Sequence, residues 1–263
     1  EVDEKEELLR VQGLTCINAE GVAAVRDVSF TAYGGEILGI AGVAGSGQKE
    51  LCEAIAGLYH VKSGSIEFKT GAGFENIVGA KPDEIFKKGI SLAFVPEDRL
   101  GMGLVGSLDM VDNMLIRSYK NNKGPLVDRK TAKKVCDELI ESLEIVTPGT
   151  STPVRRLSGG NVQKVLLGRE IHYNPKVLMV SYPVRGLDIN SSFKIYDLLN
   201  GQKKKGVAVI FVGEDLDVLM EISDRILVLC GGVLTGIVDP RNVTKEDVGL
   251  LMVHTGGEKE AGK

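Results

Sequence analysis

Tryptophan is absent from this 263-residue sequence, and phenylalanine and tyrosine bring the aromatic fraction to only 5%. A basic balance is lacking too, because the formal net charge is −4. Proteins that bind nucleic acid are usually basic, and those that hold single strands stack the bases on aromatic side chains. These two absences argue against a nucleic-acid partner.

Cysteine and histidine side chains at the spacing of a metal site are also missing. No CxxC pair occurs among the four cysteines, which are Cys16, Cys52, Cys136 and Cys230. Scattered cysteines of this kind are typical of reduced thiols in a cytosolic protein. The three histidines (His60, His172 and His254) show no pairing with carboxylates at ligand spacing, so we expect no metal site.

Long apolar runs are a third absence. No stretch approaches the roughly 20 apolar residues that cross a bilayer, and the N-terminus does not resemble a signal peptide. Any role at a membrane therefore has to come through a partner. The length suits one α/β domain, and the apolar (43%) and charged (26%) fractions are those of an ordinary globular protein.

Strand and helix signals alternate along the chain. Apolar segments predict strands at residues 8–14, 22–30, 36–41, 177–180, 207–212, 225–230 and 233–238. Apolar residues at helical spacing predict a helix over residues 131–144 with Asp128 as its cap, and another that begins near Leu51. This order favours a largely parallel sheet covered on both faces. We expect a charged linker at residues 1–7, one domain at 8–252 with a helical section at about 100–156, and a flexible tail at 253–263.

A glycine-rich loop lies between a predicted strand and a predicted helix. Such a turn presents backbone N–H groups at the positive end of the helix dipole and can hold phosphate without side chains. The phosphate-loop pattern G-x-x-x-x-G-K-[ST] is met in its glycines, but Gln48 replaces the lysine and Lys49 replaces the metal-binding hydroxyl. The candidate nucleotide-binding residues are Gly42, Val43, Ala44, Gly45, Ser46, Gly47, Gln48, Lys49 and Glu50.

Two interpretations of Lys49 stay open. In one, its ammonium stands in for the metal, which gives nucleotide binding that does not depend on Mg²⁺. In the other, it is a solvated residue in the first turn of a helix. Glu50 adds a negative charge near the phosphates and favours weak binding.

Further motifs give the chain a family resemblance. They are GVAGSGQKEL at residues 42–51, VPEDR at 95–99, LSGGNVQK at 157–164, RGLD at 185–188 and SDRI at 223–226. With these motifs, residues 8–252 resemble the second nucleotide-binding domain of the two-cassette ATPases that drive simple-sugar and nucleoside importers. The resemblance implies a RecA-like P-loop core of the ABC ATPase type with a mainly parallel sheet, an N-terminal antiparallel β-subdomain and an inserted α-helical subdomain.

The sequence departs from the family at the positions that do chemistry. Glu97 stands at the Q-loop glutamine, Ser181 and Tyr182 at the metal-holding aspartate and the water-polarising glutamate, and Glu214 at the switch histidine. Phosphoryl transfer depends on positioning, charge neutralisation by metal and an oriented water. We therefore expect no hydrolysis in this chain's own site, with ATP binding possible, weak or independent of metal, and Mg²⁺ doubtful.

The signature loop, by contrast, is complete. The resemblance assigns to it contact with a partner cassette's ATP, through Leu157, Ser158, Gly159, Gly160, Asn161 and Gln163. Ser158 is a suitable N-cap for the helix that follows, and the glycines allow N–H groups to approach a γ-phosphate closely. The alternative is an ordinary capped helix after a glycine turn. Asp188 stands where the family keeps its D-loop aspartate.

The resemblance also implies partners. They are a second cassette bound head to tail, expected as the N-terminal half of the same chain, transmembrane permease subunits, and indirectly an extracytoplasmic substrate-binding protein. The chain is then peripheral at the cytoplasmic face, and its apolar segment 99–113 is either a docking surface or interior.

Two other functions stay open: an active ATPase that uses Lys49 with Glu97 or Glu214, and an interaction module without a transporter. The transported sugar or nucleoside is left open.

Overall fold

The computed structural model describes residues 5–118 and 127–254. They fall into two compact units, the first built from residues 5–94, 175–182 and 198–254, the second from residues 95–118, 127–174 and 183–197. Most of the expected linker at residues 1–7 and tail at 253–263 lies outside the described residues. Within the described ranges, no helix is both long and apolar enough to span a bilayer.

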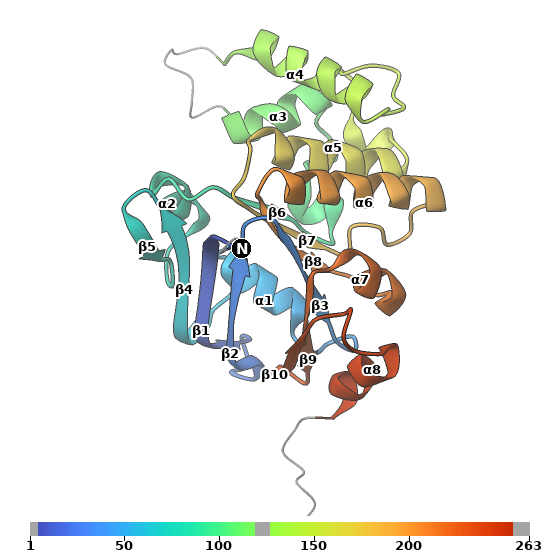
Figure 1. Cartoon of the computed structure of the whole chain (residues 1–263). Helices are drawn as coiled ribbons and strands as arrows, with labels where there is room; N and C mark the ends of the chain where they lie inside the picture. The colour runs from blue at the N-terminus through green and yellow to red at the C-terminus, as the bar shows by residue number, and fades with distance from the viewer. Residues whose placement is uncertain (1–4, 119–126, 255–263) are drawn as a thin grey trace, which may run out of the picture. The chain divides into compact units, whose positions relative to one another are not determined.

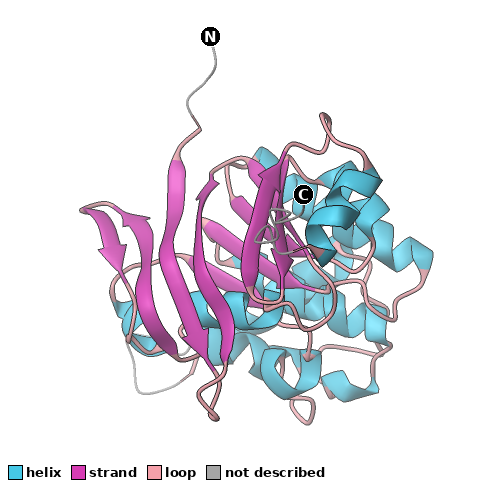
Figure 2. Ribbon diagram, turned by 90° about the horizontal axis from the view of Figure 1, so that it is seen from below, coloured by secondary structure: helices cyan, strands magenta, loops and turns pink. Residues whose placement is uncertain are grey.

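The first unit is organised around a ten-stranded sheet, counted over the described residues, in the order β5-β4-β1-β2-β10-β9-β3-β8-β7-β6. Figure 2 shows its strands in magenta. The bounds are β1 Glu7–Ile17, β2 Ala23–Tyr33, β3 Glu36–Ala41, β4 Val61–Thr70, β5 Gly73–Asn76, β6 Leu92–Val95, β7 Val177–Ser181, β8 Ala208–Val212, β9 Arg225–Cys230 and β10 Val233–Val238.

The sheet has an antiparallel part and a parallel part. Strand β1 pairs antiparallel with β2 and β4, and β4 pairs antiparallel with β5. Strand β3 pairs parallel with β8 and β9, and β8 pairs parallel with β7. Strands β3, β7 and β8 are buried at every position, as expected for parallel strands with both faces covered. The expected fold class is confirmed, including the antiparallel N-terminal strands.

The helices of the first unit are α1 Gln48–Ile55, α2 Pro82–Lys87, α7 Leu216–Ile222 and α8 Lys245–Val253. Helix α1 packs against β1, β2 and β7, and α8 packs on β9 and β10 (Figure 1). In α1 the buried positions include Leu51, Cys52 and Ile55, which share one face. The helix therefore fixes the loop before it by packing that face against the sheet.

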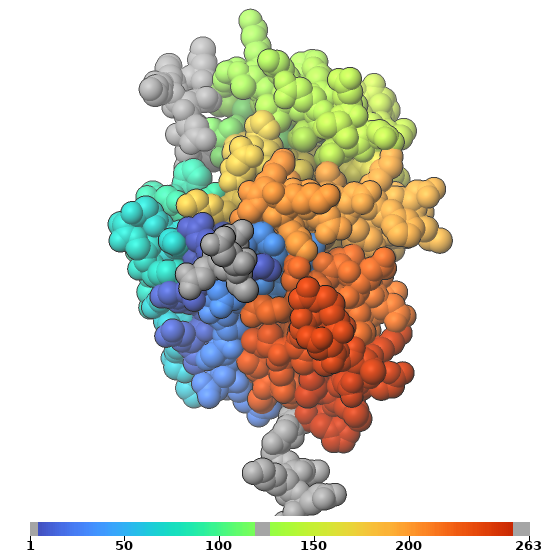
Figure 3. Space-filling view, viewed as in Figure 1, coloured from blue at the N-terminus to red at the C-terminus, as the bar shows by residue number. Residues whose placement is uncertain are grey.

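The second unit is helical. It holds a π-helix at Arg99–Gly103, α3 Met110–Ser118, α4 Arg129–Ser142, a 3₁₀ turn at Val154–Arg156, α5 Gly159–His172 and the first half of α6 Ile189–Lys204. Helix α4 packs on α3, and its charged residues are mostly exposed. In Figure 3 the segment that contains α4 lies at the surface, in yellow-green. Asp128 caps α4 as predicted, because its carboxylate accepts a hydrogen bond from the Thr131 N–H at 3.0 Å. The helix ends two residues earlier than predicted, and Glu144 there has a positive φ of 50°.

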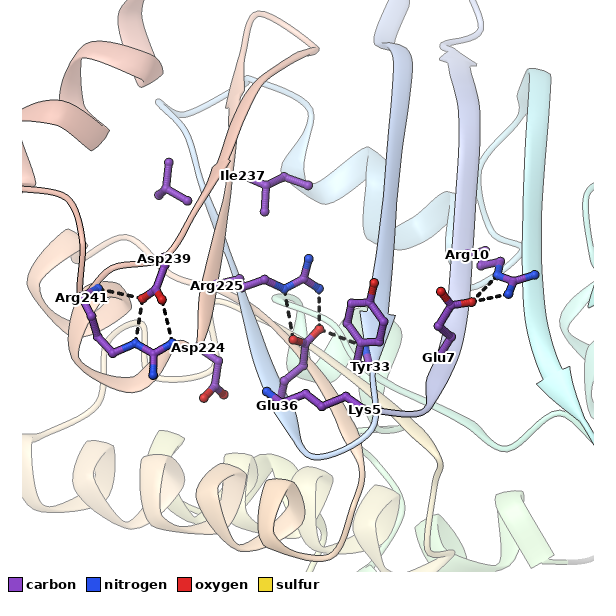
Figure 4. Close-up of a pocket in the computed structure, with 11 residues that line it drawn as sticks. Lys5, Glu7, Arg10, Tyr33, Glu36, Asp224, Arg225, Ile237, Asp239 and Arg241 are labelled. Carbon is purple, nitrogen blue, oxygen red and sulfur yellow. Dashed lines mark hydrogen bonds and ion pairs between the residues drawn. The ribbon is translucent and has the colours of Figure 1, made fainter. Parts of the chain in front are cut away.

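A buried ion pair ties the start of β3 to β9 in the first unit. The Glu36 carboxylate is almost fully buried and accepts hydrogen bonds from Arg225 Nε at 3.1 Å and Nη2 at 2.6 Å. It also accepts the Tyr33 N–H at 2.9 Å. Both residues line an open pocket of about 830 Å³, in which the pairs Arg241–Asp239 and Arg10–Glu7 lie near solvent (Figure 4).

Removal of the Arg225 charge should destabilise the fold. We expect Arg225→Gln to lower the free energy of unfolding by about 3 kcal/mol, because a buried carboxylate is left without its partner charge. The matched variant Arg241→Gln breaks an exposed pair in the same pocket and should leave stability unchanged within error. Denaturant unfolding followed by circular dichroism measures both, and equal losses would contradict this account.

Candidate functional site

The phosphate loop is shaped by its own backbone and by neighbouring strands. Gly45 and Gly47 have positive φ values of 83° and 96°, and a Cβ on Gly47 would lie 2.5 Å from the Ala24 carbonyl. Ser46 is buried and its carbonyl accepts the Gly232 N–H at 3.1 Å. No side chain caps the first turn of α1, so the N–H groups of that turn remain available to an anion.

Gln48 turns its side chain into the loop. The residue is 3% exposed, and its Nε2 donates to the Val43 carbonyl at 3.2 Å. A Cβ on Gly42 would lie 2.6 Å from the same nitrogen, so the carboxamide fills the space beneath the loop. The position that carries a phosphate-binding ammonium in the full motif thus holds a neutral group already engaged within the loop.

Lys49 points its charge at its own helix. Its Nζ lies 3.8 Å from Glu53 Oε1, one turn along α1, and its side chain is 55% exposed. Burial raises the pKa of the Glu53 carboxyl, Lys49 lowers it in part, and Glu50 raises it further. This contact favours the interpretation of Lys49 as a first-turn surface residue over a substitute for the metal ion.

Ser181 is the last residue of β7. It is 2% exposed, and its hydroxyl makes no conventional hydrogen bond within the described structure. It lies against the Cys52 thiol, which is a weak partner, and burial raises the pKa of this thiol to about 12 despite that contact. An aspartate at this position would hold a cation, whereas a serine hydroxyl carries no charge to attract one.

The other two substituted positions of the first unit lie at strand ends. Tyr182 follows β7 with a positive φ of 48°, and its N–H donates to the Val212 carbonyl at 2.8 Å. Its ring packs in part against the hydrophobic core. Glu214 follows β8 and is exposed.

The loop therefore suits the phosphate groups of a magnesium nucleotide but not its metal ion. Its uncapped N–H groups and its glycines suit a phosphate. The metal positions do not suit Mg²⁺, because Lys49 is cationic and Ser181 is neutral and buried. The described residues contain no group of three His, Cys, Asp or Glu side chains placed to hold a metal ion.

The signature loop of the second unit presents an oriented hydroxyl. Ser158 caps α5, and its Oγ accepts from the Asn161 N–H at 3.4 Å and from Asn161 Nδ2 at 2.9 Å. Asn161 is held in turn, because its Oδ1 accepts the Val146 N–H at 3.0 Å. A serine hydroxyl has two acceptor sites and one donor, so with both acceptor sites used the exposed O–H is left to donate outward.

The glycines of this loop lie close to the D-loop. A Cβ on Gly160 would lie 2.8 Å from Ser191 Oγ and 3.9 Å from Asp188 Oδ2. Asp188 accepts hydrogen bonds from the Ser191 N–H at 2.9 Å and hydroxyl at 2.6 Å, which lower its pKa. The predicted signature and D-loop residues thus come together within this unit.

Gln163 does not belong to that surface. It is 1% exposed, and neither carboxamide atom has a hydrogen-bond partner among the described residues. The structure therefore places this side chain in the interior of the second unit, and its contact with a partner's nucleotide stays a prediction. Helix α5 buries every residue from Val162 to Glu170.

Two arginines at the signature loop were not singled out as site residues from the sequence. Glu97, at the expected glutamine position, forms an ion pair with Arg185. Arg99 Nη2 donates to the Arg185 carbonyl, and a Cβ on Gly159 would lie 3.5 Å from Arg99 Nη1. Only the motif letters at residues 95–99 and 185–188 contained a signal for this contact.

The segment at residues 99–113 is divided between interior and surface. Leu104, Met110 and Val111 are buried, whereas Leu100, Met102 and Val105 are each about two-fifths exposed. We call these last three residues the docking surface. They come from the π-helix Arg99–Gly103 and the turn after it.

Comparison with known proteins places these features in a family. The ABC transporter family model matches residues 25–184. The chain is 38% identical over 261 residues to the guanosine import ATP-binding protein NupO of Bacillus subtilis. The aligned region covers 98% of this chain and 50% of NupO. It is 36% identical over 246 residues to the galactose/methyl galactoside import ATP-binding protein MglA of Escherichia coli. That aligned region covers 92% of this chain and 47% of MglA. The chain spans about half the length of these relatives.

Solved structures show the same fold. The ATP-binding cassette MJ0796, in a dimeric structure bound to ADP and Pi, superposes with a TM-score of 0.76 at 21% identity, over 90% of this chain and 100% of that chain. At this identity, the similarity shows that the two chains share a fold and nothing more. With the family model matched over more than half of its length, the chain belongs to the ABC transporter family and has the fold of its ATP-binding cassettes.

Proposed function

We propose that this chain is the second cassette of a two-cassette ATPase that drives import of a nucleoside or a simple sugar. In this proposal it completes the ATP site of a partner cassette with its signature loop, and its own site binds ATP weakly without hydrolysing it. The observation that carries the proposal is the contrast between the outward-donating Ser158 hydroxyl and the inward-turned Gln48 carboxamide.

The importer assignment rests on the relatives. NupO and MglA are named as import ATP-binding proteins for guanosine and for galactose or methyl galactoside, and each is about twice as long as the matched region. A partner cassette in the missing half of such a chain would account for that length. The cassette would then work on the cytoplasmic face of the membrane, with permease subunits beside it and a substrate-binding protein on the other side.

In the chain's own site, the residues can bind a nucleotide but cannot activate a water to hydrolyse it. The N–H groups of the first turn of α1 would hold a phosphate, while Gln48 adds no charge. Nothing at positions 181 and 182 holds a metal ion or polarises a water as a carboxylate would. A general base alone contributes about 10²–10⁴-fold, so we expect no useful turnover here.

At the partner's site, the chain supplies hydrogen-bond donors. The Ser158 O–H and the N–H groups of Gly159 and Gly160 lie at the positive end of α5, a 14-residue helix. Groups held in place before the reaction cost no reorganisation when charge develops on the transferred phosphoryl group. The bond from Val146 to Asn161 contributes by fixing the side chain that orients Ser158.

The docking surface gives the chain a place for a membrane subunit. Leu100, Met102 and Val105 expose apolar side chains close together in sequence, on a segment held rigidly by the rest of the second unit. A helix of a permease subunit that laid its apolar face here would remove them from water.

Nucleotide binding to this chain should be weak and independent of metal. In calorimetric titrations of ATP we expect the same Kd with Mg²⁺ and with chelator, and no released phosphate. Gln48→Lys should tighten binding by about tenfold, because a charge-assisted hydrogen bond to phosphate is gained. Lys49→Ala should change the Kd by less than about threefold, because Lys49 pairs with Glu53.

Two results would contradict this account of the site. Steady phosphate release that requires Mg²⁺ would favour an active ATPase that uses Lys49 with Glu97 or Glu214. Tight binding that Lys49→Ala abolishes would instead favour the lysine as a substitute for the metal ion.

Loss of the Ser158 hydroxyl should slow the partner's site. In the two-cassette ATPase we expect Ser158→Ala to lower kcat by about 10²-fold, the cost of one electrostatic stabiliser. Ser158→Asp keeps a capping oxygen but places a negative charge beside the phosphate, so it should be at least as slow while retaining the melting temperature. Ser158→Thr keeps both functions and should remain active. Unchanged turnover in Ser158→Asp would refute signature-loop donation.

Charge on the docking surface should uncouple the chain from its permease. Met102→Glu and Val105→Glu should abolish co-purification with the membrane subunits and substrate uptake, because each side chain is exposed in this chain and would be buried in the complex. Ile116→Glu, at an exposed position of the otherwise largely buried α3, is the matched control and should retain both. Intact uptake in the first two variants would favour a module without a transporter.

A further inference from the structure

A short π-helix begins beside the signature loop and carries part of the docking surface. It spans Arg99–Gly103, and the Asp98 carboxylate caps it by accepting the Gly101 N–H at 2.8 Å. Its far end is bonded to the last turn of α5, because Arg169 Nη2 donates to the Gly103 carbonyl at 2.7 Å. Arg169 is itself buried and paired with Glu170. The turn therefore has little freedom to move apart from α5.

The near end of the π-helix is held by Arg99. Its Nη2 donates to the carbonyl of Arg185, the first residue of the D-loop motif. Its Nη1 faces the α carbon of Gly159, the first residue of α5, where a Cβ would lie 3.5 Å away. One planar guanidinium thus lies between the two loops that would meet a partner's nucleotide.

Charge balance explains why the guanidinium keeps this position. Glu97, two residues before Arg99, pairs with Arg185 and offsets one of the two positive charges of the cluster. Burial lowers the pKa of Arg99, and Glu97 opposes that effect. Glutamine at position 97 would supply a hydrogen bond without the charge, which gives a physical reason for glutamate here.

We propose that Arg99 is a positioning residue that holds the signature loop and the D-loop at a fixed spacing, with Glu97 as the anchor of Arg185. This inference rests on the proposed function for its consequence, since the spacing matters only if both loops act on a partner's nucleotide. The contacts themselves belong to this chain and can be tested in it alone.

Hydrogen exchange measured by mass spectrometry tests the positioning. In Arg99→Gln, we expect exchange of the peptides covering residues 158–162 and 185–191 to rise by about tenfold, as for the loss of a hydrogen bond from a charged group. Exchange in β3 and β8 should not change. Arg99→Lys keeps the charge but loses the planar fork, so it should restore only part of the protection.

Arg156→Gln provides the matched control. Arg156 is exposed, lies two residues before Ser158, and loses the same charge in the variant. The Arg156→Gln variant should show the same amide hydrogen exchange as the unmodified chain. Unchanged exchange in Arg99→Gln, or an equal rise in Arg156→Gln, would overturn the inference. A rise spread over the whole chain would also overturn it, because that indicates general destabilisation.

Turnover of the two-cassette ATPase separates this inference from the proposed function. If both are right, Arg99→Gln lowers kcat by about tenfold with little change in KM, because loop spacing acts on the transition state. If exchange rises locally but neither Arg99→Gln nor Ser158→Asp slows turnover, the positioning stands and signature-loop donation fails. If Ser158→Asp slows turnover and Arg99→Gln changes neither exchange nor kcat, the reverse holds.

Discussion

The first N–H groups of an α-helix have no partner inside the helix, and this constraint governs both candidate nucleotide surfaces of the chain. Helix α1 begins after the glycine loop with no side-chain cap, whereas α5 begins with Ser158 bonded to Asn161. Each start can hold an anion by backbone alone. What distinguishes them is the set of side chains that the sequence adds.

At α1 the added groups do not help a nucleotide. Gln48 is engaged with Val43, Lys49 with Glu53, and Ser181 lies buried against Cys52. At α5 the added groups leave a donor free, since Asn161 uses both acceptor sites of Ser158 and leaves its O–H exposed. In the proposed function, the same backbone device would hold a nucleotide in one unit and donate to a partner's nucleotide in the other.

The sequence was sufficient for the framework. The strands at residues 36–41, 225–230 and 233–238 have the predicted bounds, because continuous apolar runs between turn residues leave little ambiguity. Asp128 and Ser158 were identified as caps from their residue type and position alone. Strand β4 was missed, since its sequence VKSGSIEFKT is mostly polar and contains a glycine.

The site residues were predicted unevenly for a related reason. A motif specifies which residue occupies a position but not which way its side chain turns. Gln163 was expected to meet a partner's ATP with its neighbours, yet α5 is buried on nearly every side, so amphipathic periodicity could not place its side chain. The Glu97–Arg185 pair joins positions 88 residues apart, and nothing in local sequence links them.

The placement of Arg99 connects two surfaces that sequence motifs treat separately. Its backbone starts the π-helix that carries Leu100 and Met102, and its side chain contacts the D-loop carbonyl beside Gly159. The far end of that helix is bonded to α5 through Arg169, and a Cβ on Gly103 would lie 2.6 Å from Leu166 of α5. Close packing of this kind has few alternative arrangements and transmits displacement. A displacement of Leu100 or Met102 would therefore be passed to α5 through these contacts, which in the proposed function would link the docking surface to Ser158.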